Sequence, residues 1–176
     1  EFVAANTLVD ILSGPLWATA VALIFSGWIQ ELGTVPYATL FWWLAIVSTW
    51  SGIATFIRYR YRRDPAPEAN TRWPSTYTWL YALNGAIWGS ITWLFWIDGN
   101  AANNVMLIMV ALATSISYGF QLTPHYRTYL ATTLSLHLLL TARYIVDPTG
   151  IGTVFIFLGP AFAVWVLING KESSRK

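Results

Sequence analysis

The chain has 176 residues, of which 56% are hydrophobic, 16% aromatic and only 10% charged, with a formal net charge of +2. Soluble domains carry about 25% charged residues, so this composition excludes an ordinary water-soluble domain and favours an integral membrane protein. The sequence contains no cysteine, which excludes disulfides, thiolate catalysis and thiolate metal sites.

Six apolar segments of membrane-spanning length follow one another along the chain. About 20 helical residues cover the roughly 30 Å hydrocarbon core. The segments are continuous rather than alternating, which favours helices over a β-barrel. Gly14-Pro15 interrupts the first segment and leaves open a separate short interfacial helix over residues 2–12. We predict an all-α membrane protein in which residues 1–176 form a single six-helix transmembrane domain with short loops. The predicted spans are 8–29, 36–57, 76–97, 101–121, 125–145 and 150–168.

The one long connection, between the second and third segments, contains the run Arg58-Tyr59-Arg60-Tyr61-Arg62-Arg63. Four arginines in six residues cannot lie in hydrocarbon, and the positive-inside rule places such a loop in the cytoplasm. This assignment puts both termini and nine of the ten basic residues on the cytoplasmic side of a bacterial inner membrane. Arg143 is the exception, near the outer end of the fifth segment, where its spacing allows a pair with Asp147.

Small residues spaced four apart mark the third and fourth segments. This spacing lets another helix approach closely, either within the bundle or across a dimer seam. The residues concerned are Gly85 and Gly89 in the third segment, and Ala111, Ser115 and Gly119 in the fourth.

His137 falls near the middle of the fifth segment, where an ionisable side chain is costly and marks a candidate functional site. Two interpretations stay open. One is a neutral histidine bonded to a Ser, Thr or backbone carbonyl of a neighbouring helix, and the other is a group that senses a ligand or a proton. His125 is twelve residues away, about 18 Å along a helix, so we predict no metal site. The candidate polar points of a ligand cavity among the third to sixth segments are Asn84, Trp88, Tyr118, His137 and Arg143.

The sixth segment carries Gly159-Pro160 at its midpoint. Proline in a helix removes a backbone hydrogen bond and usually kinks the helix. Because this segment leads directly to the C-terminal tail, Pro160 is either a hinge that transmits movement or a static kink.

Catalytic and transport signatures are missing from the sequence. It has no Gly-rich phosphate loop, no HExxH and no pair of acids inside a predicted span. Ion-coupled transport usually needs an intramembrane acid, and no inverted repeat is visible, so a pump is disfavoured. We predict no enzymatic activity for this chain alone, and we assign no cofactor.

The layout nevertheless forms a recognisable pattern. It combines the basic loop at residues 58–63 with Ala82-Leu83-Asn84-Gly85-Ala86-Ile87-Trp88-Gly89, a Pro124 turn, and a basic exit from Lys171 to Lys176. The third-segment motif is similar to A-L-x-x-G-x-x-W-G. Together these features resemble the six-transmembrane N-terminal sensor regions of bacterial signalling proteins, which precede histidine kinase or diguanylate cyclase (GGDEF) output domains. The resemblance implies that this chain is an input module that relays a signal to a C-terminal cytoplasmic output domain.

We therefore interpret the chain as a dimeric sensor in the lipid bilayer that receives a small hydrophobic ligand or an outer-side signal and does not bind nucleic acid. Two alternatives from other classes stay open. One is a small transporter or channel that works as an oligomer. The other is a structural subunit of a larger membrane complex, in which the many tryptophans and tyrosines form contact surface or lie next to pigments.

Overall fold

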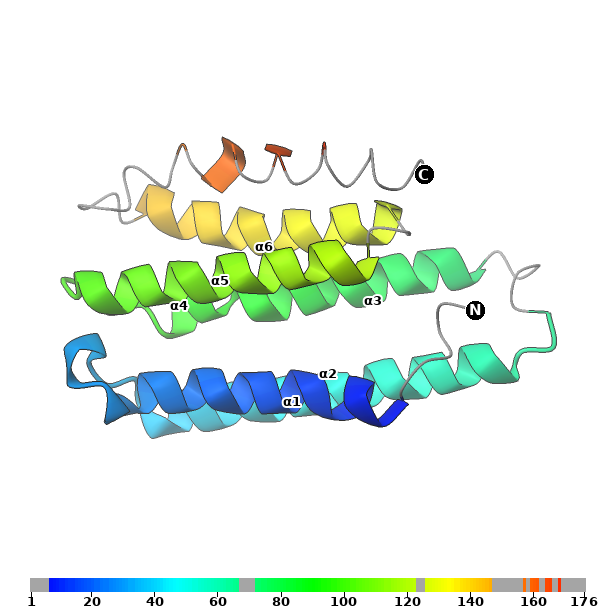
Figure 1. Ribbon diagram of the computed structural model, residues 1–176, viewed down its shortest axis with the longest axis horizontal. Coiled ribbons are helices and arrows are strands. Elements are labelled where there is room, and N and C mark those ends of the chain that lie inside the picture. The colour runs from blue at the N-terminus through cyan, green and yellow to red at the C-terminus, as the bar shows by residue number, and fades with distance from the viewer. Residues whose placement is uncertain are drawn as a thin grey trace. The chain divides into compact units, whose positions relative to one another are not determined.

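The computed structural model describes residues 7–66, 72–122 and 126–146, with isolated positions between 157 and 168 (Figure 1). Every regular element in these residues is a helix. Contacts between residues divide the chain into two compact units, residues 1–76 and residues 77–176.

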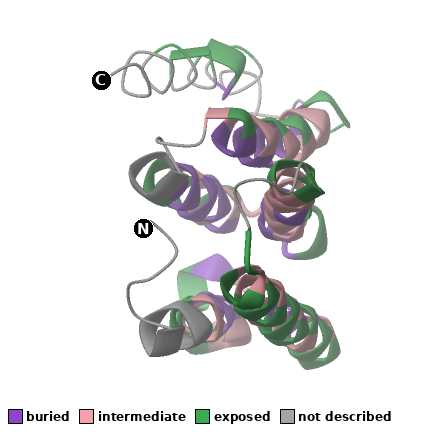
Figure 2. Cartoon of the chain, turned by 90° about the vertical axis from the view of Figure 1, so that its right-hand side faces the viewer, coloured by how far each residue is buried: buried purple, intermediate pink, exposed green. Residues whose placement is uncertain are grey.

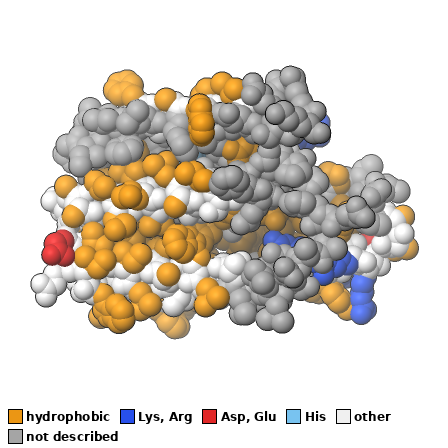
Figure 3. All heavy atoms as spheres, in the orientation of Figure 1, with side chains coloured by type: hydrophobic (Ala, Val, Ile, Leu, Met, Phe, Trp, Pro, Cys, Tyr) orange, Lys and Arg blue, Asp and Glu red, His pale blue; other side chains and the backbone are white. Residues whose placement is uncertain are grey.

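Within the part of the chain that the structure describes, three helices are long and apolar enough to cross a membrane, which indicates a membrane protein. Hydrophobic side chains also cover much of the visible surface of the described helices, as a lipid environment requires (Figure 3). The six-span count and the cytoplasmic position of both termini stay predictions. The three helical stretches are Tyr37–Arg63, Ala101–Tyr118 and Tyr126–Val146.

The first unit begins with α1 (Thr7–Leu23), which runs unbroken through Pro15. Gly14-Pro15 therefore does not end the first helix, and the alternative of a separate helix that stops at residue 12 is wrong. Proline costs the helix one backbone hydrogen bond, but α1 packs along its neighbour α2, and such packing can hold a helix together across one lost bond.

A compact turn joins α1 to the next long helix. It contains η1 (Ile24–Trp28) and η2 (Gln30–Leu32). Gly27 has a φ of +93°, a conformation that favours glycine, and the chain reverses there. The amide of Val35 then donates to the carbonyl of Phe25 over 3.1 Å, which closes the turn.

α2 (Tyr37–Arg63) packs antiparallel to α1. A Cβ atom added to Gly14 would lie 2.9 Å from Ser51 Oγ, so the two backbones approach closely there. In this register Thr7 lies level with Arg58, and the last turns of α2 continue past the start of α1 (Figure 1). Among the described side chains of this unit, the buried ones include Ala18, Val21 and Ala22 of α1, Phe25 of η1, and Leu40, Trp43 and Val47 of α2.

The second unit contains most of α3 (Arg72–Gly89), then α4 (Ile91–Leu94), α5 (Ala101–Leu122) and α6 (Tyr126–Val146). Ser90 joins α3 to α4 in helical geometry, because its amide donates to Ala86 O over 2.9 Å. These helices lie within a few residues of the predicted third, fourth and fifth segments. Most of the predicted sixth segment lies outside the described residues, although Pro160 itself is helical.

The glycine pair of α3 lies against α6. A Cβ atom on Gly85 would collide with the backbone carbonyl of Thr132 and the hydroxyl of Ser135, and one on Gly89 would lie 3.1 Å from the carbonyl oxygen of Leu136. Ser135 Oγ donates to Ala82 O over 2.7 Å across the same contact. The absence of side chains at these two positions therefore lets α3 and α6 approach within backbone contact.

Candidate functional site

The second unit buries polar side chains on α4, α5 and α6. Figure 2 colours the buried residues of these helices purple. Many of the hydroxyls are satisfied within their own helix. Thr114 Oγ1 donates to Val110 O, and Thr132 Oγ1 donates to Thr128 O, each over 2.8 Å. Such back-bonding lets a hydroxyl lie in an apolar interior at little cost. The polar groups that instead reach another helix are the ones that link the elements of this unit.

His137 makes one of these links. Its Nε2 atom lies 3.0 Å from Ser115 Oγ, and both side chains are buried between α6 and α5. A histidine bonded to a serine of a neighbouring helix is the first of the two interpretations left open by the sequence. The imidazole also carries the ionisable group on which the sensing interpretation depends.

Asn84 makes another such link. Its Nδ2 atom donates to the hydroxyl of Tyr118 over 2.7 Å and so connects α3 to α5. Tyr118 lies three residues from Ser115, about 4.5 Å along the helix. The two contacts are therefore neighbours, and we name the four side chains that form them the interior polar track. Its members are Asn84, Tyr118, Ser115 and His137.

Two other candidate positions border the interior polar track. Trp88 is buried one turn after Asn84 and shares its side of α3. Ala111 is buried one turn before Ser115 on α5. The contacts of Gly119 lie outside the described residues. The interior polar track is therefore bordered by an aromatic side chain on α3 and a small one on α5.

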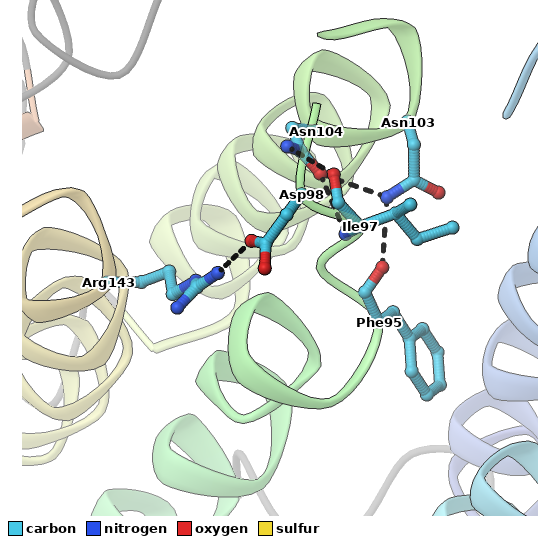
Figure 4. Close-up of polar contacts among 6 residues, drawn as sticks. All are labelled: Phe95, Ile97, Asp98, Asn103, Asn104 and Arg143. Atoms are coloured by element: carbon cyan, nitrogen blue, oxygen red, sulfur yellow. Dashed lines mark hydrogen bonds and ion pairs between the residues drawn. The ribbon is translucent and has the colours of Figure 1, made fainter. Parts of the chain in front are cut away.

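Arg143 lies away from the interior polar track, six residues beyond His137, which is about 9 Å along α6. Its Nη2 atom donates to Asp98 Oδ1 over 3.0 Å (Figure 4). The guanidinium also lies over two indole rings, 5.7 Å from the centroid of Trp93 and 4.8 Å from that of Trp96. The predicted partner Asp147 lies outside the described residues. The structure thus places Arg143 apart from the other four candidate positions.

Sequence reasoning missed a group of asparagines at the start of α5. Asn103 Nδ2 donates to Phe95 O over 2.9 Å, and Asn104 Nδ2 donates to Ile97 O over 3.0 Å (Figure 4). Asn104 Oδ1 also accepts from the amide of Ile97. Asn100 Oδ1 accepts the amide of Asn103, as an N-cap does. The signal was available in Asp98-Gly99-Asn100, a turn sequence followed by two further asparagines.

Among the described residues, no three His, Asp or Glu side chains gather as a metal site would require. Comparison of the chain with protein-family models, with curated proteins and with solved structures gives no match.

Proposed function

We propose that the chain is the transmembrane sensor region of a bacterial signalling protein. It has six spans with both termini in the cytoplasm, forms a homodimer, and relays a small hydrophobic or outer-side signal to a C-terminal output domain of the histidine kinase or diguanylate cyclase type. The chain itself performs input rather than catalysis. Support comes from the all-helical fold, the three helices long enough to cross a membrane and the short connections between helices.

The observation that carries the proposal is the interior polar track. Its two contacts join three helices. Ser115 has a second acceptor within reach, because a serine hydroxyl can also donate to the carbonyl four residues earlier in its own helix. Hydrogen bonds between membrane helices contribute only about 0.6 kcal/mol on average. Such contacts can exchange partners at small cost. A group of helices that switches between two conformations requires contacts of this kind.

A ligand acts on such a group only through its different affinities for the two states. A small amphipathic molecule that bonds to one member of the interior polar track competes with that member's helix partner and so changes how α3, α5 and α6 are held together. α6 precedes the predicted sixth span, so a displacement of α6 is the movement passed toward the tail. Both proposed functions of the track, binding and relay, thus follow from the same side chains.

Topology gives the first test. The chain has no cysteine, so a single introduced cysteine is a unique label site. In intact cells an impermeant maleimide should label Ala101→Cys, whereas Arg62→Cys and Ser173→Cys should be labelled only after permeabilisation. The cysteine-free parent is the control. Labelling of Ser173→Cys from outside would place the C-terminus outside the cytoplasm and would contradict the proposal.

The coding sequence gives the second test. A sensor region must be followed by a helical linker and an output domain, so we expect both beyond Lys176. A stop codon directly after Lys176 would count against the sensor role and would favour the channel or structural-subunit interpretations. Flux of a small solute into liposomes that contain the protein would favour the channel specifically.

A further inference from the structure

α2 is longer than a membrane crossing needs. Its 27 residues extend about 40 Å, against about 30 Å for the hydrocarbon core. Residues 37–57 already fill that thickness, and the remaining six residues contain four arginines. We name these four the arginine collar. Its members are Arg58, Arg60, Arg62 and Arg63. With the apolar part of α2 in hydrocarbon, the arginine collar lies at the depth of the headgroups.

The arginine collar extends beyond the helix that covers the rest of α2. In the α1–α2 register Thr7 lies level with Arg58, so the following turns of α2 pass the beginning of α1. Arg60, Arg62 and Arg63 are accordingly exposed, and Arg58 is half-buried. The charged side chains are therefore presented to the surroundings of the helix rather than to the interior of the first unit.

The four arginines surround the helix. At about 100° per residue, Arg58 and Arg62 project on one side, and Arg60 and Arg63 project on the other. A folded protein or a nucleic-acid groove contacts one side of a helix at a time. Headgroups of a lipid leaflet, in contrast, surround a helix on all sides. The arrangement of charge therefore favours a lipid partner over a soluble macromolecule.

The end of α2 is also held in place. The guanidinium of Arg63 lies 4.5 Å from the centroid of the Tyr59 ring. Asp64 ends the helix with its amide bonded to Tyr61 O, and its carboxylate accepts a 2.7 Å hydrogen bond from Trp73 Nε1. Trp73 in turn packs edge-on against Tyr61, with ring centroids 5.4 Å apart. The arginine collar is thus part of an ordered helix end, where less side-chain and backbone freedom is lost on binding.

We propose that the arginine collar binds the phosphates of anionic phospholipids in the leaflet that it faces. Guanidinium groups match phosphate oxygens in a bidentate way, and clusters of basic residues next to a membrane helix attract anionic headgroups. Residues 58–72 carry five arginines against Asp64 and Glu68, so the local charge is complementary to such lipids. The proposal depends only on membrane residence and not on a sensor role, so either can fail without the other.

The test measures phosphatidylglycerol bound to the full chain by native mass spectrometry, in micelles that contain phosphatidylglycerol and phosphatidylcholine together. The triple variant Arg60→Gln, Arg62→Gln, Arg63→Gln should weaken retention of phosphatidylglycerol at least tenfold and leave retention of phosphatidylcholine unchanged. The matched control, Arg127→Gln, Arg175→Gln, Lys176→Gln, removes the same charge elsewhere and should change retention less than about twofold. Replacing the same three collar arginines by lysine keeps the charge but removes the bidentate geometry, so retention should fall between that of the parent and that of the glutamine variant.

Equal losses in the collar variant and the control would mean that net charge alone attracts the lipid, which would overturn the proposal. Unchanged lipid retention together with loss of a co-purifying acidic protein or nucleic acid would also overturn it and would identify a soluble partner. If the triple variant does not fold, the single variants Arg60→Gln and Arg63→Gln provide the same comparison, with a smaller expected loss of about threefold each.

Discussion

The Nε2 atom of His137 lies 3.0 Å from the Oγ atom of Ser115, and this contact joins the middle of α6 to α5 in the buried interior of the second unit. Ser115 lies one turn from Tyr118, which is bonded to Asn84 of α3. An ionisable side chain in the middle of an apolar helix is thus connected through α5 to a third helix. This connection distinguishes His137 from a residue that only fills space.

His137→Leu tests whether the connection has a signalling role. Leucine keeps most of the volume, and Ser115 can donate to Ala111 O instead, so we expect a stability loss of about 1 kcal/mol or less. In the longer protein that the proposed function requires, kinase or cyclase activity should no longer change when the signal is added. Thermal unfolding in detergent and output activity are the two measurements.

Ser115→Ala provides the comparison for His137→Leu, because it removes the same hydrogen bond and retains the imidazole. If the variant at 137 unfolds the protein, the histidine is structural. If the output of both variants equals that of the parent, the interior polar track does not transmit the signal. A response that is lost at 137 but retained at 115 would assign the role to the imidazole rather than to the bond.

Gly85→Ala tests the contact of α3 with α6. Its new methyl group would collide with the Thr132 carbonyl, a backbone atom that cannot rotate away, so we expect a loss of about 1–3 kcal/mol. Gly52→Ala is the matched control, because no heavy atom lies within 4 Å of the added methyl and alanine favours a helix by up to about 1 kcal/mol. Thermal unfolding in one detergent compares them. Equal melting temperatures would show that α3 and α6 do not approach as described.

The sequence predicts the helices well because a membrane helix is marked by a long apolar run that needs no knowledge of its neighbours. The spacing of Gly85 and Gly89 also indicates a close approach, since only small residues permit one. Hydropathy alone cannot show that α6 is the approaching helix, because this depends on how the connections fold. The same holds for the bond between Asn84 and Tyr118, which are 34 residues apart.

Loop contacts are the part of the candidate site that the sequence could not show. Arg143 is four residues from Asp147, and helix spacing alone favours that pair. The ion pair in the structure is formed with Asp98, 45 residues away, because the turn after α4 brings this carboxylate to the end of α6. Asn104 holds that turn through the backbone of Ile97. Such contacts depend on three-dimensional turn geometry, which a linear pattern does not record.

Arg143 contacts both an acidic side chain and two indole rings, and two variants can separate these contributions to stability. Asp98 is 86% exposed, so the ion pair is screened by water, and Asp98→Asn should cost less than about 1 kcal/mol. Arg143 is only 15% exposed and lies over two indole rings, so Arg143→Gln loses the cation–π contacts as well and should cost about 1–2 kcal/mol.

Thermal unfolding of both variants should be measured at low salt and at about 1 M salt. Salt should abolish the effect of Asp98→Asn and leave most of the effect of Arg143→Gln, because the guanidinium is shielded by Trp93 and Trp96. Equal effects that both vanish in salt would show that the indole rings contribute nothing and that the exposed ion pair alone holds the loop to α6.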